Sequence, residues 1–264
     1  MAIAIHTIVF IWLWMSSFWL MSIPLRNVAI IDYGWGLGFI GVSITAYTTG
    51  TNYHLPLVIA ITLWGMRLFI YLLMRQTHQH EDKRYSAIRE HYGNESFWWQ
   101  SYGIIFMPQG LFMAIMSIPL VLVQTQQIVT LTPIRISLAV CACFIWLIGL
   151  YIESISDWQL LQFKRLHPNK LCNTGWWYYS RHPNYFGEIL IWWSQYIFFV
   201  SISPLTWPTL LASISPIFIH IAIIKLSGVN RMESAMQHRY DNFQNYHENT
   251  SMLIPWWPKK NNYH

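Results

Sequence analysis

The amino-acid sequence predicts an all-α protein, an integral membrane bundle of seven transmembrane helices with its N-terminus outside and its C-terminus in the cytoplasm. Of its 264 residues, 54% are hydrophobic and 10% are charged, whereas roughly a quarter of the residues in a soluble domain are charged. The apolar residues gather in runs of about 20, the length that a helix needs to cross the hydrocarbon layer. The lipid bilayer is therefore the first partner expected for this chain.

Seven apolar runs follow one another, with no internal repeat or low-complexity linker between them. They cover Ile3–Ile23, Val28–Tyr47, Leu55–Arg75, Gly103–Val123, Pro133–Ile155, Tyr185–Ser201 and Leu205–Leu226. The last two are separated only by a short turn, so they are expected to form an antiparallel pair. The economical interpretation is one domain over residues 1–264, in which residues 227–264 form a cytoplasmic amphipathic tail or lid.

Lysine and arginine residues fix the predicted orientation. They gather in the connections that fall on one side if the helices alternate in direction, and the opposite loops carry only Arg135. The basic residues on the first side are Arg26, Lys83, Arg84, Arg89, Lys164, Arg165, Lys170, Arg181, Arg231, Arg239, Lys259 and Lys260. By the positive-inside rule this side faces the cytoplasm, as in a bacterial inner membrane. The net charge of +5 therefore reports topology, and no nucleic-acid partner is expected.

Metal binding is not expected. The three cysteines make no paired framework, and the spacing of His78, His80 and His91 matches no familiar set of zinc ligands.

The stretch GWWYYSRHPNYFGE contains the clearest polar motif. Arg181 and His182 precede Pro183, which is typical of the first position of a helix. A guanidinium and an imidazole beside a helix N-terminus would favour an anion. Asn184 and Glu188 lie four residues apart, on one helix face. The alternative is a basic juxtamembrane loop that merely caps a helix.

Charged residues inside the apolar runs are costly and indicate function or pairing. Asp32 lies near the cytoplasmic end of the second run, where it is either a functional carboxylate or an interfacial helix cap. The glycines after it would let a neighbouring helix or a ligand approach closely. Arg67, Tyr71 and Arg75 follow one another at four-residue steps on the third run. Such a stripe suits phosphate and ribose oxygens, although Arg67 could instead pair with an aspartate.

The fifth run continues as YIESISDWQLLQFKR, in which Glu153 and Asp157 are one turn apart and Lys164 lies two turns further on. Two carboxylates on one face could hold ribose hydroxyls or orient arginine side chains; the alternative is a charged helix end that emerges into water. In the fourth run, Pro108, Gln109 and Pro119 suggest a kink or a polar contact.

Two roles are open for the tail. Its first part is amphipathic, and Trp256 and Trp257 near its end would suit an anchor at the headgroups. As a lid over a nucleotide, it would offer the side chains of Glu233, His238, Tyr240 and Tyr246.

RHPNYFGE, together with LWGMRLFIYLLMR and TSMLIPWWPK, resembles the steroid 5-alpha-reductase-like integral membrane family, most closely its bacterial branch of unknown function. The likeness extends from about Asp32 to Lys259. It implies that NADPH lies in a cytoplasm-facing cavity and that the hydrophobic substrate is a lipid or steroid-like enone, reduced at its C=C bond.

The resemblance places Arg67, Tyr71, Asp157, Lys164, Asn184 and Glu188 at the family's cofactor contacts, and Arg181 and His182 in the bacterial motif. With the candidates from the residue patterns, the predicted cofactor site comprises Arg67, Tyr71, Arg75, Glu153, Asp157, Lys164, Arg181, His182, Asn184, Tyr185, Glu188, Tyr240 and Tyr246. The predicted catalytic residues are Asp32, Tyr33 and Tyr71.

One position departs from the family pattern. Trp64 stands where the steroid-reducing members have a tyrosine, and an indole N–H is no useful proton donor. Either Tyr33, Tyr71 or Tyr85 supplies the acid, Asp32 serves as the carboxylate, or the substrate is not a steroid-type enone.

Two other functions share these features. A membrane methyltransferase of the isoprenylcysteine carboxyl methyltransferase type would use HPxYxGE to hold S-adenosylmethionine, but that cofactor has no phosphate to occupy the arginines. A non-enzymatic lipid-binding protein would use its polar residues only to tie helices together.

Overall fold

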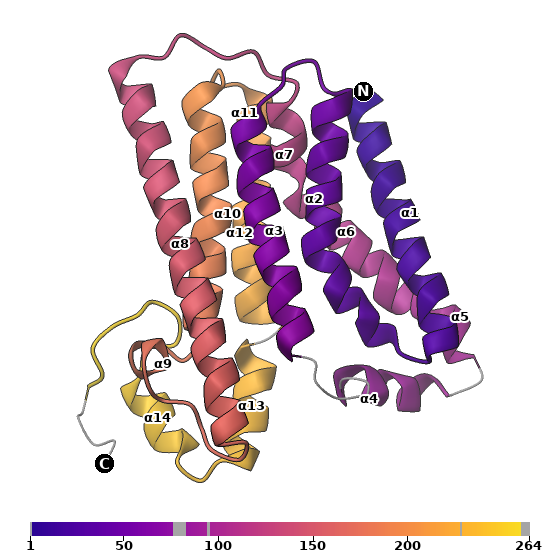
Figure 1. Ribbon diagram of the computed structural model, residues 1–264, viewed down its shortest axis with the longest axis vertical. Helices are drawn as coiled ribbons and strands as arrows, with labels where there is room; N and C mark the ends of the chain where they lie inside the picture. Colours follow the sequence, from indigo (N-terminus) through magenta and orange to yellow (C-terminus); the bar gives the residue numbers. More distant parts are fainter. Residues whose placement is uncertain (1, 76–82, 94–95, 228, 260–264) are drawn as a thin grey trace. The chain divides into compact units, whose positions relative to one another are not determined.

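The computed structural model describes residues 2–75, 83–93, 96–227 and 229–259, which fold into helices joined by short loops (Figure 1). Within these residues the only β-type pairing is an isolated bridge between Ser180 and Ser251. The all-α prediction is confirmed for the described part of the chain. His78 and His80 lie outside it, and so does Lys260.

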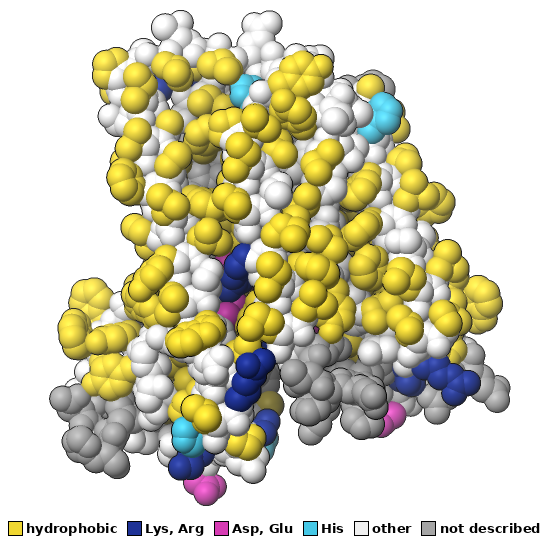
Figure 2. All heavy atoms as spheres, in the orientation of Figure 1, with side chains coloured by type: hydrophobic (Ala, Val, Ile, Leu, Met, Phe, Trp, Pro, Cys, Tyr) yellow, Lys and Arg dark blue, Asp and Glu magenta, His cyan; other side chains and the backbone are white. Residues whose placement is uncertain are grey.

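Among the described residues, five helical stretches are long and apolar enough to cross a membrane: Ala2–Leu25, Val28–Thr49, Leu55–Arg75, Pro133–Leu166 and Trp207–Lys225. Exposed hydrophobic side chains cover the faces of the helices in Figure 2, as contact with lipid requires. The chain is therefore a multi-pass integral membrane protein. The count of seven spans and the orientation stay predictions.

The fourth expected helix is interrupted. The stretch divides into α5 (Phe97–Ser101), the π-helix η2 (Tyr102–Phe106), α6 (Met107–Met116) and α7 (Ile118–Val123). Proline lies in the first turn of both α6 and α7, where its missing N–H and fixed φ favour a new helix start. The expected polar contact also forms, because the indole N–H of Trp35 donates to Oε1 of Gln109 at 2.8 Å.

The last expected span is interrupted in the same way. It consists of α11 (Trp207–Leu211), α12 (Ile214–Ile221) and the π-helix η3 (Ala222–Ser227). The sixth expected span, in contrast, is one continuous helix, α10 (Pro183–Ile202).

The fold divides into two compact units. The first comprises residues 1–128 and 203–214, and the second comprises residues 129–202 and 215–264. Units of this kind can be halves of one membrane domain, so the single-domain expectation stays a prediction.

The first unit is built on α1 (Ala2–Leu25), the short helix η1 (Val28–Ile30), α2 (Ile31–Thr49) and α3 (Leu55–Arg75). The backbones of α2 and α3 meet at Gly36 and Gly65, where a side chain on either glycine would strike the carbonyl oxygen of the other. This is the close approach expected for small residues between membrane helices. Trp64 is fully buried beside this crossing, and its ring makes an edge-to-face contact with that of Phe39. A further helix, α4 (Lys83–Tyr92), follows α3.

The second unit is built on the antiparallel helices α8 (Pro133–Leu166) and α10, joined through the short helix α9 (Trp176–Tyr179) (Figure 1). Their backbones meet at Gly149 and Gly187. A Cβ atom on Gly187 would lie 2.6 Å from the carbonyl oxygen of Gly149 and 2.7 Å from the amide nitrogen of Glu153. Only glycine fits here, and the close crossing fixes which polar residues of the two helices lie opposite each other.

The tail helices α13 (Val229–Arg239) and α14 (Phe243–Asn249) lie beside the C-terminal end of α8 and the start of α10 (Figure 1). Leu171, Tyr240, Phe243 and Tyr246 form a buried cluster between them. The segment after α14 runs along the loop that precedes α10, with the amide of Arg181 donating to the carbonyl of Ser251 at 2.8 Å and that of Trp256 to the carbonyl of Tyr179 at 3.0 Å.

Candidate functional site

The predicted site residues fall into both units. Asp32, Tyr33, Arg67, Tyr71 and Arg75 belong to the first, and the others belong to the second. One cofactor site built from both sets stays a prediction, and the polar contacts are described within each unit.

The α8–α10 crossing places two of the predicted residues in direct contact. Nδ2 of Asn184 donates to Oδ1 of Asp157 at 3.0 Å, and the side chains of Asp157 and Glu153 are each buried, with 4% exposure. Oδ1 of Asn184 is buried and has no hydrogen-bond partner among the described residues. A buried acceptor of this kind is costly unless a ligand or water donates to it. Glu188 follows one turn later on the same helix face.

Arg181 is held by the tail. Its Nε donates to Oε1 of Glu233 at 2.7 Å and its Nη2 to Oε2 at 3.3 Å. Its Nη1 donates to the carbonyls of His247 at 2.8 Å and Thr250 at 2.6 Å. Four of the five N–H groups of a guanidinium are thus engaged. These contacts hold the tail against Arg181. Its predicted phosphate-binding role stays a prediction, because a phosphate could bind Arg181 only if it replaced some of these contacts.

Two histidines meet the same carboxylate. His182, 1% exposed, places Nε2 3.0 Å from Oε1 of Glu233, and the half-exposed His247 places Nε2 3.3 Å from Oε2. The ring of His182 stacks on Tyr185, whose hydroxyl lies 3.9 Å from the sulfur of Met232 in the tail.

The surroundings of Glu233 lower the pKa of its carboxyl to about 2. Burial alone would raise this pKa, but the hydrogen bonds from His182 and Arg181 and the charge on Arg181 outweigh it. Glu233 is therefore ionised over the whole physiological range, and it balances the guanidinium beside it.

The other tail residues of the predicted site, Tyr240 and Tyr246, form hydrogen bonds with the rest of the second unit. Nζ of Lys164 donates to the hydroxyl of Tyr240 at 2.7 Å, and the hydroxyl of Tyr246 donates to the carbonyl of Trp177. The tail is thus folded back onto the helix ends. Trp256 and Trp257 are 71% and 72% exposed, so the two aromatic rings remain available at the surface.

In the first unit, Asp32 is hydrogen-bonded to Tyr85, which the sequence suggested as a possible acid but which was not in the predicted catalytic set. The hydroxyl of Tyr85 on α4 donates to Oδ1 of Asp32 at 2.9 Å, and Tyr85 is buried. Asp32 also lies in the first turn of α2, where the helix dipole favours a carboxylate. The guanidinium of Arg67 lies 5.5 Å from the ring centre of Tyr71, as their four-residue spacing predicts.

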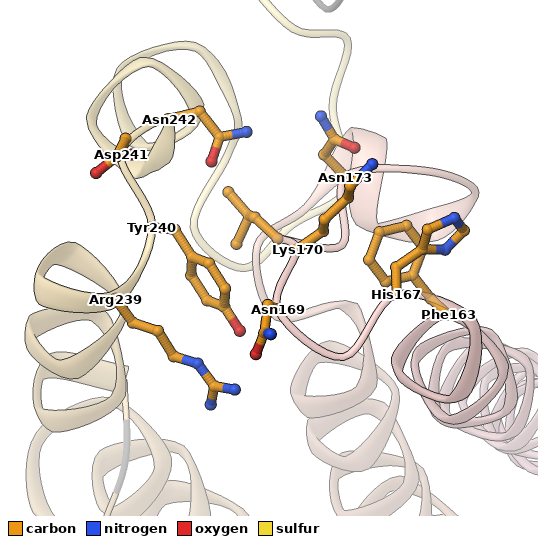
Figure 3. Close-up of a pocket in the computed structure, with 10 residues that line it drawn as sticks. Phe163, His167, Asn169, Lys170, Asn173, Arg239, Tyr240, Asp241 and Asn242 are labelled. Carbon is orange, nitrogen blue, oxygen red and sulfur yellow. The ribbon is translucent and has the colours of Figure 1, made fainter.

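A pocket of about 490 Å³ opens between the tail and the loop after α8. Figure 3 shows Arg239 and Tyr240 reaching from the tail toward Asn169 of that loop. Lys170 and His167 add basic groups, and Asp241 adds one carboxylate. This lining of cations and amides suits an anionic group. Of its lining, only Tyr240 was among the residues predicted for the cofactor site. The rest were missed because the two segments are far apart in the chain and the loop after α8 carries no recognisable motif.

Comparison with known proteins gives one positive result. No curated protein and no solved structure matches the chain significantly. Residues 18–250, however, match a family described as Protein of unknown function (DUF1295). This match covers most of the chain and most of each unit. The chain therefore belongs to the DUF1295 family, a steroid 5-alpha-reductase-like family.

Proposed function

We propose that the protein is an NADPH-dependent reductase that acts on the C=C bond of a membrane-dissolved, lipid or steroid-like enone. The observation that supports this most directly is the buried Asp157–Asn184 pair beside Glu153, with an unpartnered acceptor at Oδ1 of Asn184. Buried carboxylates and an open amide acceptor inside an apolar helix pair are expected where a polar ligand binds.

The donor and acceptor set fits NADPH. Oδ1 of Asn184 would accept an N–H from the carboxamide of the nicotinamide, and the carboxylates of Glu153 and Asp157 would accept from ribose hydroxyls. The pocket that contains Lys170 and Arg239 lies further along α8, toward its C-terminal end, and its cations would hold phosphate. S-Adenosylmethionine has no phosphate for such a pocket, so this lining favours the dinucleotide.

NADPH, when bound, supplies a hydride for the β-carbon of the enone. The residues of α8 and α10 hold the reactants in place. A proton donor must stabilise the oxygen on which negative charge develops. The three tyrosines considered, Tyr33, Tyr71 and Tyr85, all belong to the first unit. The hydroxyl of Tyr85 is positioned by its hydrogen bond to Oδ1 of Asp32, so Tyr85 is the first of the three to test, and the identity of the donor stays a prediction.

A ligand titration tests this function. The full chain, purified in detergent, is mixed with NADPH, NADH or S-adenosylmethionine, and its melting temperature Tm is measured. A ligand that binds only the folded state stabilises it by about 2.7 kcal/mol at 100 times its Kd. NADPH is expected to raise the Tm. A rise with S-adenosylmethionine alone would support the methyltransferase, and no rise with any of the three would reject both enzymes.

Two variants locate the binding site. Asn184→Ala removes the unpartnered acceptor and should weaken NADPH and NADH binding alike, whereas Arg239→Ala should weaken NADPH binding more than NADH binding because the 2′-phosphate is recognised by cations. Gln237→Ala, at an exposed tail position, is the matched control. NADPH affinity that is unchanged in both test variants would contradict the proposed site.

A further inference from the structure

Gln195 and the ring nitrogen of Trp146, both in the second unit, are among the buried polar groups that have no hydrogen-bond partner among the described residues. Gln195 on α10 is 1% exposed, and neither its Nε2 nor its Oε1 has a partner. Nε1 of Trp146 on α8 is buried in the same way. A buried amide that lacks both donor and acceptor contacts opposes folding, and in native proteins such groups require an explanation.

Both side chains continue the polar faces of the candidate cofactor site. Gln195 follows Glu188 by seven residues and Asn184 by eleven, spacings that return to the same helix face within about 20°. Trp146 precedes Glu153 and Asp157 by these same two spacings on α8.

Because α8 and α10 are antiparallel, Trp146 and Gln195 both lie beyond the Gly149–Gly187 crossing, on the side away from the tail (Figure 1). Gln195 is roughly 16 Å along the helix axis from Asn184, from a rise of about 1.5 Å per residue. The two helices therefore carry a polar face that begins with the Asp157–Asn184 pair and ends in an apolar region.

The side chains one turn away from Gln195 on α10 are bulky and hydrophobic, and the hydroxyl of Ser194 beside it is used within the helix, donating to the carbonyl of Ile191 at 2.7 Å. Ile191, Trp192 and Phe199 are fully buried next to it along the helix. An ordered water needs two to four polar partners, whereas a single carbonyl or hydroxyl oxygen on a hydrocarbon ligand is satisfied by one or two. The apolar surroundings thus favour a mostly hydrocarbon molecule that carries one oxygen.

We infer that Gln195 binds the oxygen of a membrane-dissolved carbonyl or hydroxyl compound, and that the indole N–H of Trp146 is a second donor at the same end of the polar face. The amide N–H of Gln195 donates to a carbonyl, and its own oxygen accepts from a hydroxyl. This inference rests on the proposed function, because it assigns to Gln195 the orientation of the substrate beyond the cofactor residues.

The first test is the stability of the ligand-free protein. Gln195→Met keeps the length of the side chain and removes the unpartnered amide, so the Tm in detergent is expected to rise. Gln237→Met, at an exposed tail position, is the matched control and is expected to leave the Tm unchanged. A fall in the Tm of Gln195→Met, or a failure of this variant to fold, would show that the amide has a structural role and would overturn the inference.

The second test uses cholest-4-en-3-one, a rigid hydrocarbon with one enone oxygen, and cholest-4-ene, which lacks that oxygen. The enone is expected to raise the Tm of the wild-type chain more than the hydrocarbon does. In Gln195→Met, enone affinity should fall roughly tenfold, as for one lost hydrogen bond, and Trp146→Phe should lower it as well. An absent enone effect in the wild type, or the same effect in Gln195→Met, would overturn the inference.

An NADPH titration of the same two proteins separates this inference from the proposed function. NADPH binding without any dependence of enone binding on Gln195 would reject the inference alone. Enone binding that depends on Gln195 without NADPH binding would reject the reductase and leave the oxygen-binding role of Gln195 in place.

Discussion

At the scale of single residues, Glu233 is the carboxylate that holds the tail. It receives Arg181 and His182 from the start of α10 and His247 from α14. A guanidinium buried without a partner is costly, and loss of one member of such a pair is far more damaging than the pair is stabilising. The pairing of Arg181 with Glu233 cannot be recognised in the sequence, because 52 residues separate them.

We expect Glu233→Gln to destabilise the protein by ~3 kcal/mol at neutral pH, because the charge of Arg181 loses its counter-ion. The measurement is the Tm in detergent. Glu248→Gln, at an exposed position of α14, is the control and should change little.

The same carboxyl predicts a pH dependence. Its pKa is lowered from 4.5 to about 2 in the folded chain, so its contribution to stability is present above pH 4.5 and is lost as the pH falls toward 2. The Tm of the wild type should therefore fall more steeply on acidification than that of Glu233→Gln. Parallel curves for the two proteins would show that Glu233 is not the titrating group.

Tyr85→Phe tests the proton donor. Removal of a general acid costs a factor of about 100 or more in rate, so enone reduction should fall by that amount while NADPH affinity stays unchanged. Tyr92→Phe, at an exposed position of the same helix, is the control. Full activity in Tyr85→Phe would assign the proton to another group.

At the scale of helices, the two units share one construction: a pair of glycines at which two backbones touch. The glycines after Asp32 predicted such an approach, and the Gly36–Gly65 crossing confirms it. The crossing of Gly149 and Gly187 was not recognised, because Gly149 is a single glycine in a long apolar run and Gly187 stands in the RHPNYFGE motif, where the polar residues drew the interpretation. The partner of a helix face is decided by residues remote in the sequence, so a lone glycine gives no sign of what it meets.

Gly187→Ala should destabilise the second unit by about 1–3 kcal/mol, the usual cost of overpacking, because the new methyl group would meet the backbone of α8. NADPH binding should weaken in parallel, since the crossing positions Asn184. Gly103→Ala is the control: a methyl group there meets nothing within 4 Å. Equal Tm values for the two variants would contradict the crossing.

At the scale of the whole molecule, the membrane class and the helical fold followed from composition and run length, which are properties of the entire chain. The interruption of the fourth expected helix was indicated by Pro108 and Pro119. The interruption of the last span, the individual tail contacts and the residues that meet across the glycines did not follow, because they depend on packing between distant segments. The Asp157–Asn184 contact was anticipated as two polar faces in one site, although their hydrogen bond to each other was not.

Cysteine labelling tests the topology. In a background with Cys141, Cys143 and Cys172 replaced by serine, Thr130→Cys should react with a membrane-impermeant maleimide in intact cells. Glu248→Cys should react only after the cells are permeabilised. This pattern follows from seven spans and the positive-inside rule. Labelling of both positions in intact cells would require an even number of spans between them, and the predicted orientation would be wrong.

The attachment of the tail also affects how the protein is made. The carbonyls that bind Arg181 belong to residues 66 and 69 positions further along the chain, so they leave the ribosome after α10 has been translated. Until then the guanidinium of Arg181 has no counter-ion at the N-terminal end of this helix. A chain that ends before Glu233 would lack the carboxylate and both carbonyls that bind Arg181, so the finished C-terminus is needed to compensate this cation.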